Sequence, residues 1–344
     1  MQKQQLRENK MKKGLWALSA ATLFAMTTSV QAKQEICVFD LLGKAGESYK
    51  LIEEWKLASK TWQGDVELIA YQDEQKAEQD FDAGKCDGVY MTSMRARKYN
   101  KFAGSIDAVG AVTSNAIAQK AISYVLDKRN KSRLTATVNG EKYEVAGIIE
   151  VGLAYIFVRD KRIDTIEKAK GKKFAYLHYD QAQKTIVESL DLIAVPSDIS
   201  DFVKKFNSGQ VDVIAAPAYA YKPLEISKGL AKSGAMFTFP VVNITGDLII
   251  RPGKFPANFG TQSRQWFINK LPSNFAMVQR LESGMNARKI NLSNEDKVRY
   301  QKMLREGRMN LTKQGVYDAT MMNVLKRARC TVERTNFECT LSGE

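Results

Sequence analysis

Apolar runs alternate with amphipathic stretches along the first part of the chain. Three short apolar runs, "EICVFDLLG" (35–43), "VELIAYQ" (66–72) and "CDGVYMTS" (86–93), have the length and composition of buried strands. The stretches between them, 46–61 and 74–83, have helical spacing. This β-α-β-α-β order predicts three parallel strands with right-handed crossovers.

The same order returns after residue 160. A helical stretch (115–128) and a long extended run (142–160), in which Gly147 and Gly152 predict bends, come first. Strands are then predicted at 173–178, 192–196 and 211–218, with helices at 181–190 and 199–207 and a short one before residue 173. A second extended run (236–252) precedes a mostly helical remainder from about 261, in which Ser293 and Asp296 form a capping pattern.

Each unit ends in the same motif. "DFDAGKCDGVYMT" (80–92) and "KFNSGQVDVIAAP" (205–217) both place Phe, Gly and Asp three residues apart before an apolar run. Both are predicted helix-to-strand junctions, in which Asp87 and Asp212 bond to backbone groups of the turn rather than to a ligand.

Two α/β units joined by long extended segments predict an α/β fold of two lobes, with crossover strands and a helical C-terminal part. The expected boundaries are 33–148 plus about 248–344 for lobe I with the C-terminal helices, and 149–247 for lobe II. Because ligands of open α/β sheets bind at the carboxyl ends of the strands, the cleft between the lobes is the expected site.

Candidate ligand-binding residues are those at strand ends and on the crossover runs. They are Asp40, Tyr90 and Thr92 in lobe I, Tyr176, His178, Tyr179 and Tyr219 in lobe II, and Glu150, Tyr155 and Asn243 on the crossover runs. The tyrosines offer stacking faces and hydroxyls for a small solute. A lone His in a strand is also typical of a structural role.

Glu150 interrupts an apolar run from Val145 to Val158, where a charge is costly unless it is paired or hydrated. One interpretation places it in the cleft, receiving a cationic or hydroxyl-bearing group. The other pairs it structurally with an Arg or Lys. The sequence leaves both open.

The N-terminus has the pattern of an export signal. Met11 to Ala32 begins with Lys12 and Lys13, continues with an apolar run and ends in Val30-Gln31-Ala32, which fits a signal-peptidase site. The run is short and rich in Ser and Thr for a membrane anchor. We therefore expect residues 1–32 to be a cleaved signal peptide and the mature protein to be periplasmic.

Charge and cysteine content agree with export. Residues 1–32 carry five basic side chains and one acidic side chain, so the formal charge of the mature chain is 14 − 4 = +10. The basic residues are dispersed, which favours a solvated surface over nucleic-acid binding. Cys330 and Cys339 are expected to form one disulfide, which leaves Cys37 with Cys86, a pair that neighbouring parallel strands permit. With no CxxC pair and a single His, no metal or other cofactor is expected.

An enzyme is not indicated. The sequence has no GxSxG, no P-loop, no HExxH and no GxGxxG after a strand. One His and four paired cysteines also leave few nucleophile–base pairs.

The segment from Ile163 to Pro217 resembles the second lobe of the periplasmic solute-binding proteins of TRAP transporters, the DctP-like family. Typical motifs of the family are "DLKG-K-IR", "LGA-PV" and "ALQ-G-VDG-E-P". At the corresponding positions this chain has "IEKAKGKKFAYLHYD", "LIAVP" and "KFNSGQVDVIAAP". The resemblance implies capture of a small solute, delivery to integral-membrane transporter subunits, and a monomer. The family's carboxylate-binding Arg corresponds here to Ala175, which puts an organic-acid ligand in doubt.

The segment "GKKFAYLHYDQAQ" and the cysteines resemble those of an AdeT-like subgroup, which is nominally associated with RND efflux pumps. An alternative function is therefore an envelope accessory protein of such a system, without transport activity of its own. A pump needs many membrane spans, which this chain lacks, so we favour the binding protein.

Overall fold

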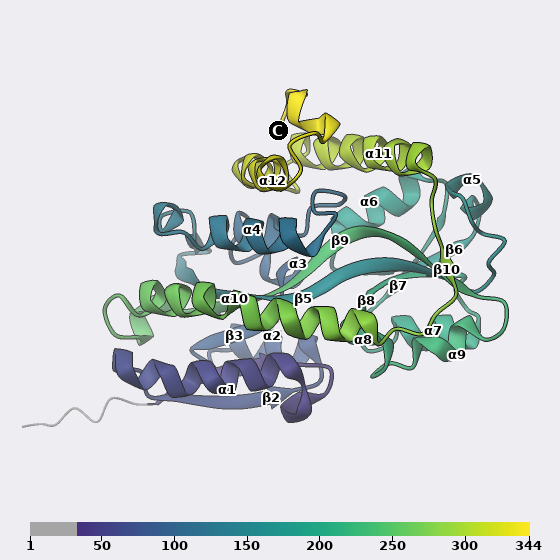
Figure 1. Ribbon diagram of the computed structural model, residues 1–344. Helices are drawn as coiled ribbons and strands as arrows, with labels where there is room; N and C mark the ends of the chain where they lie inside the picture. The colour runs from purple at the N-terminus through teal and green to yellow at the C-terminus, as the bar shows by residue number, and fades with distance from the viewer. Residues whose placement is uncertain (1–32) are drawn as a thin grey trace, which may run out of the picture. The chain divides into compact units, whose positions relative to one another are not determined.

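The computed structural model describes residues 33–344, which form one unit (Figure 1). The predicted signal peptide, residues 1–32, lies outside the described residues. Helices and strands alternate through most of the unit, so the predicted α/β class is confirmed.

One twisted sheet passes through the unit in the order β2-β1-β3-β9-β5-β8-β6-β7. Its strands are β1 (Gln34–Phe39), β2 (Val66–Tyr71), β3 (Gly88–Thr92), β5 (Glu141–Val158), β6 (Lys173–Leu177), β7 (Ile193–Ser197), β8 (Val213–Pro217) and β9 (Ala235–Ile250). Two short strands, β4 (Thr135–Val138) and β10 (Lys289–Ile290), pair with β5 and β9 at its margins. The sequence pattern did not predict these two.

The first half of the sheet contains the three parallel strands that were predicted. β1 pairs in parallel with both β2 and β3, so it lies between them. We call β1–β3, with the helices that follow them, the β1–β3 half. The predicted disulfide between Cys37 and Cys86 is present, with a Cα–Cα distance of 5.9 Å.

The second half repeats this arrangement. β6 pairs in parallel with β7 and β8 and lies between them, and we call this set the β6–β8 half. The long strands β5 and β9 pair antiparallel with each other, and each also joins one half. Their pairing is irregular next to Gly147 and Gly152, where bends were predicted.

The repeated motif performs the same task in both halves. Gly84 and Gly209 have φ values of 75° and 81°, the left-handed conformation that ends a helix. The Asp87 carboxylate accepts a hydrogen bond from Glu35 N at 3.1 Å, and the Asp212 carboxylate accepts one from Lys173 N at 2.9 Å. The aspartates therefore bind backbone groups, as predicted, and each fixes the start of the neighbouring central strand.

Helices cover both faces of the sheet. They are α1 (Glu47–Ser59), α2 (Glu74–Asp82), α3 (Ser93–Ala96), α4 (Asn115–Val125), α5 (Ile166–Ala169), α6 (Gln181–Ser189), α7 (Phe202–Ser208), α8 (Ala218–Tyr221), α9 (Ile226–Leu230), α10 (Phe259–Ser283), α11 (Asn294–Lys313) and α12 (Ala319–Val332). The short helices α8 and α9 were not predicted. Ser293 caps α11 as expected, because its hydroxyl accepts a hydrogen bond from Asp296 N at 3.0 Å.

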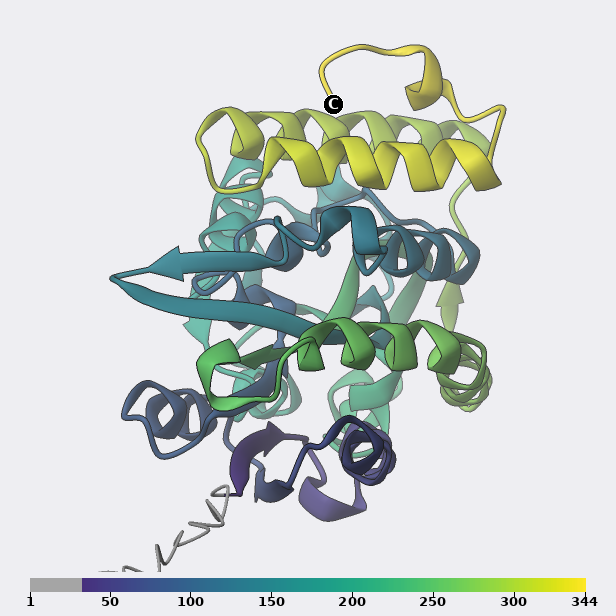
Figure 2. The same ribbon diagram turned by 90° about the vertical axis from the view of Figure 1, so that its left-hand side faces the viewer.

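The last three long helices return to the sheet from different sides. α10 lies along β5, while α11 and α12 run side by side on the other side of α4 (Figures 1 and 2). Trp55 of α1 packs against Phe259 and Phe267 of α10 and donates a hydrogen bond to Ser263 at 2.8 Å. The C-terminal part therefore completes the core of the β1–β3 half.

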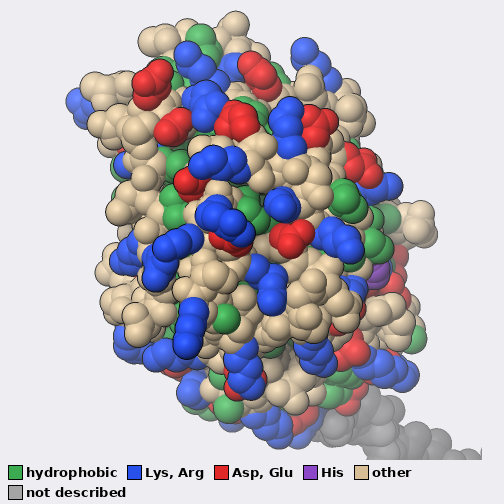
Figure 3. Space-filling view, turned by 90° about the vertical axis from the view of Figure 1, so that its right-hand side faces the viewer, with side chains coloured by type: hydrophobic (Ala, Val, Ile, Leu, Met, Phe, Trp, Pro, Cys, Tyr) green, Lys and Arg blue, Asp and Glu red, His purple; other side chains and the backbone are tan. Residues whose placement is uncertain are grey.

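Basic side chains are spread over the surface with acidic ones among them. Figure 3 shows this for one face, with Lys and Arg interspersed with Asp and Glu. Several of these lysines are paired locally, including Lys170 with Asp191 at 2.8 Å and Lys205 with Asp201 at 2.8 Å. Within residues 33–344, no helix combines the length and the apolar character that crossing a membrane requires.

Candidate functional site

A cavity of about 260 Å³ lies where the carboxyl ends of the strands from the two halves meet. Strands β1 and β3 reach it from one half and strands β6 and β8 from the other, while β5 and β9 pass between them. Helices α5, α6 and α11 close its far end. Its position is the one that open α/β sheets favour for a ligand.

At one end of the cavity, Asp40 and Tyr219 join the two halves. Asp40 follows β1, and its carboxylate accepts hydrogen bonds from the backbone of Leu42 at 2.9 Å and Tyr49 at 3.2 Å. Tyr219 of α8 donates its hydroxyl to Asp40 Oδ2 at 2.5 Å. Burial raises the pKa of Asp40, while these hydrogen bonds oppose the rise.

A second polar cluster consists of Arg97, Asp107 and Asp180. Arg97 follows α3 and binds Asp107 of its own half, and it donates to Asp180 Oδ1 of the β6–β8 half at 3.0 Å. Asp107 and Asp180 line the cavity, while Arg97 does not. Burial raises the pKa of Asp107, and the charge of Arg97 opposes that rise.

The C-terminal helices hold the segment that carries Asp107. Arg308 of α11 donates to Val109 O at 2.9 Å, and Arg329 of α12 donates to Ala111 O at 2.8 Å. Both guanidinium groups are buried and are paired with the carboxylates of Glu338 and Glu344. This network of two arginines and two glutamates ties the tail of the chain to the wall of the cavity.

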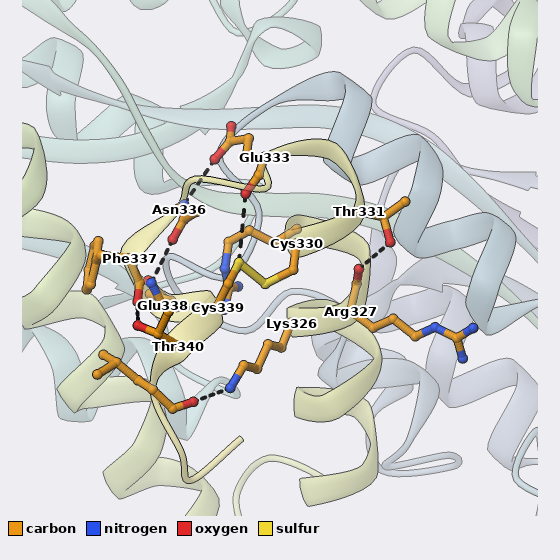
Figure 4. Close-up of a disulfide and its surroundings, with 12 residues drawn as sticks. Lys326, Arg327, Cys330, Thr331, Glu333, Asn336, Phe337, Glu338, Cys339 and Thr340 are labelled. Atoms are coloured by element: carbon orange, nitrogen blue, oxygen red, sulfur yellow. Dashed lines mark hydrogen bonds and ion pairs between the residues drawn. A yellow bond between two sulfur atoms is a disulfide. The ribbon is translucent and has the colours of Figure 1, made fainter.

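A disulfide supports that tail. Cys330, near the end of α12, is bonded to Cys339, as predicted (Figure 4). The bond fixes the turn that contains Glu338, and Glu333 and Asn336 are hydrogen-bonded within the same turn at 3.0 Å. Glu338 is thereby positioned between the two arginines.

A third set of contacts joins the halves outside the cavity. The Tyr179 hydroxyl donates to Glu74 Oε2 at 2.9 Å, and the Arg95 guanidinium lies 3.7 Å from the centre of the Tyr179 ring. Arg95 also forms ion pairs with Glu74 at 2.9 Å and with Asp198 at 3.3 Å. The carboxyl ends of the two half-sheets are therefore in direct contact, and the structure is closed at this edge.

Four of the ten predicted ligand-binding residues line the cavity: Asp40, Tyr90, Thr92 and Tyr219. Gly246 of β9 leaves room for Tyr90, since a Cβ at that position would lie 2.1 Å from the tyrosine hydroxyl. Thr92 ends β3, where its backbone N–H donates to Glu74 at 2.7 Å. The selection of residues at strand ends, which we call the strand-end rule, correctly identified these four as cavity-lining positions.

Glu150 and Asn243 lie in the interior and do not line the cavity. Burial raises the pKa of Glu150 to about 8, and the nearby side-chain amide of Asn243 opposes that rise. Asn274 of α10 binds the backbone of Glu150 through Oδ1 at 2.8 Å and Nδ2 at 2.9 Å. Neither interpretation made from the sequence matches this placement, because Glu150 does not face the cleft and forms no ion pair with a described Arg or Lys.

The remaining four candidates also lie away from the cavity lining. Tyr155 donates to Glu282 of α10 at 3.1 Å, Tyr176 packs in an apolar cluster, and Tyr179 bonds to Glu74. The His178 side chain is 42% exposed and lies 3.8 Å from Asp198. Tyr155 lies within β5, and the other three lie at the end of β6 or just after it, but none of these side chains lines the cavity.

Several lining residues were not predicted. Asp180 caps α6 directly after β6, a position that the strand-end rule could have included. Asp107 lies in an irregular segment between α3 and α4, and Tyr300 and Leu304 come from α11 more than a hundred residues further on. No sequence pattern connects those three to the cleft. Within residues 33–344, no cluster of His, Cys, Asp or Glu is arranged to hold a metal ion.

The fold has many relatives among solved structures. A TRAP periplasmic solute-binding protein from Ralstonia eutropha H16, with bound (S)-2-acetolactate, has a TM-score of 0.70 at 13% identity and covers 87% of this chain and 99% of its own. Another from Desulfovibrio salexigens, with bound orotic acid, has a TM-score of 0.66 at 12% identity and covers 88% and 99%. At these identities the likeness establishes the two-lobed binding-protein fold.

Relatives by sequence are more specific. A protein of Acinetobacter baumannii described as "Probable solute-binding protein AdeT1" is 39% identical over 308 residues, which is 89% of this chain and 100% of that protein. AdeT2 of the same organism is 27% identical over 242 residues, which is 70% of this chain and 99% of that protein. These matches favour a solute-binding protein over the efflux-accessory alternative.

The family model described as solute-binding protein AdeT 1/2 matches residues 54–344. That range contains both halves of the sheet apart from β1, and most of the residues that line the cavity. The chain therefore belongs to the AdeT 1/2 family of solute-binding proteins.

Proposed function

We propose that this protein binds a small solute in the cavity between its halves and delivers it to a TRAP-type membrane transporter. The observation that carries the proposal is the cavity itself, at the carboxyl ends of two facing half-sheets. Of the ten candidates selected from the sequence, the proposed ligand contacts are the four that line the cavity: Asp40, Tyr90, Thr92 and Tyr219. Asp107 and Asp180 join them.

Capture requires the halves to separate and close. The long strands β5 and β9 are the main connection between them, and their pairing is interrupted by bulges that can bend. We assign residues 33–148 plus about 248–344 to lobe I and 149–247 to lobe II. Helix α11 also contacts lobe II, since Arg299 pairs with Glu167 at 2.6 Å and Tyr300 accepts a hydrogen bond from Ile166 N at 3.3 Å.

We further propose that the protein acts in the periplasm. Residues 1–32 direct export to the periplasm and are removed there, and the mature protein acts as a monomer beside integral-membrane transporter subunits. Two disulfides fit an oxidising compartment. Membership of a solute-binding family supports binding rather than catalysis as the role of the cavity.

Native mass spectrometry of the purified protein tests this proposal. The protein should carry a co-purified solute, and Ala154→Trp, which fills the cavity from β5, should lose it. Ala276→Trp, at an exposed position on α10, is the matched control and should retain the solute. If the protein carries no solute and is not stabilised by any member of a library of organic acids, amines and sugars, the proposal fails.

A further inference from the structure

We infer that the cavity takes a cationic amphiphile, a molecule with an apolar body and a protonated amine. The inference rests on the proposed function and specifies the ligand class of the same site. Two features of the lining carry it, the predominance of apolar side chains and the sign of the charged ones.

The apolar part of the cavity extends well beyond the cleft between the strand ends. Side chains from β6, α6, β9 and α11, among them Phe174, Ile186, Phe237 and Leu304, line this arm. Such a surface offers few hydrogen bonds to a sugar or a polyol, whose hydroxyls would lose their water without replacement. An apolar body of the ligand gains free energy in the same space, since it leaves water.

The charged side chains that line the cavity are all acidic. They are Asp40, Asp107 and Asp180, and among the described lining residues there is no Lys, Arg or His. Arg97 lies behind Asp107 and Asp180 and is shared between them, so one positive charge faces two negative charges. Asp40 is bonded to backbone N–H groups and to the Tyr219 hydroxyl, and no described cation pairs with it.

These carboxylates suit an ammonium group. An ammonium carries a positive charge and three N–H donors, and carboxylate oxygens are its natural acceptors. Both hydrogen bonds that described residues donate to the Asp180 carboxylate go to Oδ1, so Oδ2 receives none from them. A carboxylate ligand would instead meet like charges in a site of low polarity.

Ala175 supports the preference for an ammonium group over a carboxylate. It lines the cavity with a methyl group, which offers no positive charge and no hydrogen bond to a carboxylate ligand. The solved structures reported above hold organic acids. This chain has their fold, but none of its described lining residues carries a guanidinium or an ammonium group.

A matched probe series tests the inference by isothermal titration calorimetry with the purified protein, stripped of co-purified solute. Decylamine, decan-1-ol and decanoate share one apolar chain and differ in the head group. We expect decylamine to bind at least about 10-fold more tightly than decan-1-ol, and decanoate to bind more weakly than both.

Two substitutions test the assignment of the head-group site. Asp180→Asn should weaken decylamine binding about 10-fold and narrow the gap between amine and alcohol, because it removes one carboxylate. Ala175→Arg should reverse the preference toward decanoate. Asp191→Asn, which removes an exposed carboxylate paired with Lys170, is the control and should bind all three probes as the unaltered protein does.

The outcomes separate this inference from the proposed function. Tighter binding of decanoate than of decylamine overturns the ligand class and leaves solute binding intact. If no probe binds, the co-purified solute decides, and an organic acid or a sugar overturns the ligand class. The absence of any solute, together with no stabilisation by any member of the library, contradicts both proposals. A melting temperature for each variant confirms that its cavity is folded, and Asp180→Asn carries the test if Ala175→Arg does not fold.

Discussion

Buried carboxyl groups are the residue-scale feature that distinguishes this protein. Glu150 and Asp247 are fully buried, and burial raises the pKa of each to about 8. Asn243 faces Glu150, while Thr245 bonds to Asp247 at 3.5 Å. Each carboxyl group therefore holds a proton at neutral pH in the folded state, and the same group is ionised in the unfolded chain.

Replacing Glu150 with Gln should make stability less dependent on pH. Because the folded-state pKa lies above the unfolded value, the contribution of Glu150 is complete below about pH 4.5 and is lost as pH rises toward 8. Over that range Glu150→Gln should remove a slope of about 1.4 kcal/mol per pH unit in the free energy of unfolding. Urea unfolding at pH 5, 6, 7 and 8 measures it.

The control for this experiment is Glu306→Gln, at an exposed position on α11. It should leave the pH dependence unchanged, and Asp247→Asn should reduce the slope in the same direction as Glu150→Gln. A slope that stays the same in Glu150→Gln would mean that Glu150 is ionised in the folded protein.

At the scale of elements, the two crossover strands are shaped by their glycines. A Cβ on Gly147 would lie 2.1 Å from the ring of Phe267 on α10, and Gly152 has a φ of 131° at a bulge. These positions let β5 bend while α10 packs closely against it. The helix and the strand therefore depend on each other for their path.

Gly147→Ala should destabilise the protein by about 1–3 kcal/mol, because the added methyl group forces Phe267 or the strand to move. Gly253→Ala is the matched control, since a Cβ there meets nothing within 4 Å. The midpoints of urea unfolding compare the two variants. Equal midpoints would show that α10 adjusts to the methyl group without cost.

The disulfide at the end of α12, between Cys330 and Cys339, also stabilises a single element of the fold. It closes a loop with a sequence separation of 9 residues, so its removal in Cys330→Ala/Cys339→Ala should cost about 3 kcal/mol. The Cys37–Cys86 bond has a separation of 49 and should contribute about 4 kcal/mol. Limited proteolysis should also cut the tail after Val332 in the first double variant alone, and a tail that stays protected would show that the Arg–Glu network suffices.

At the scale of the whole molecule, three sets of contacts hold the halves together at the carboxyl ends of their strands. They are Asp40 with Tyr219, Arg97 with Asp180, and the cluster of Glu74, Arg95, Tyr179 and Asp198. Each joins residues of the two halves that are more than eighty positions apart. Together they explain why the halves meet over the cavity rather than lie apart.

The triple variant Tyr179→Phe/Asp198→Asn/Tyr219→Phe should favour separated halves. It deletes hydrogen bonds across the cavity edge with almost no change in side-chain volume, at about 1 kcal/mol for each bond. Small-angle X-ray scattering of the ligand-free protein should show a larger radius of gyration. The control Tyr99→Phe/Asp191→Asn alters contacts within single halves and should leave the radius of gyration unchanged. An unchanged radius in the triple variant would contradict the role of the contacts between the halves.

The sequence by itself determined the parts of this protein that depend on local patterns. Alternating apolar runs and helical stretches identified the α/β units, and the repeated Gly and Asp positions identified their closing junctions, because turn conformation and strand burial are local properties. Pairing Cys330 with Cys339 left Cys37 with Cys86, which neighbouring parallel strands permit. The strand-end rule selected Asp40, Tyr90, Thr92 and Tyr219, which line the cavity, together with Tyr176, His178 and Tyr179, which do not.

Only the tertiary structure decided what faces the cavity. Glu150 interrupts an apolar run just as a cleft residue would, but the bulge before Gly152 and the packing of α10 place its side chain in the interior. Asp107 reaches the cavity from an irregular segment because Arg308 and Arg329, about two hundred residues later, bind the backbone next to it. Side-chain direction at a bulge and contacts between distant segments depend on the whole chain, and no local pattern of residues encodes them.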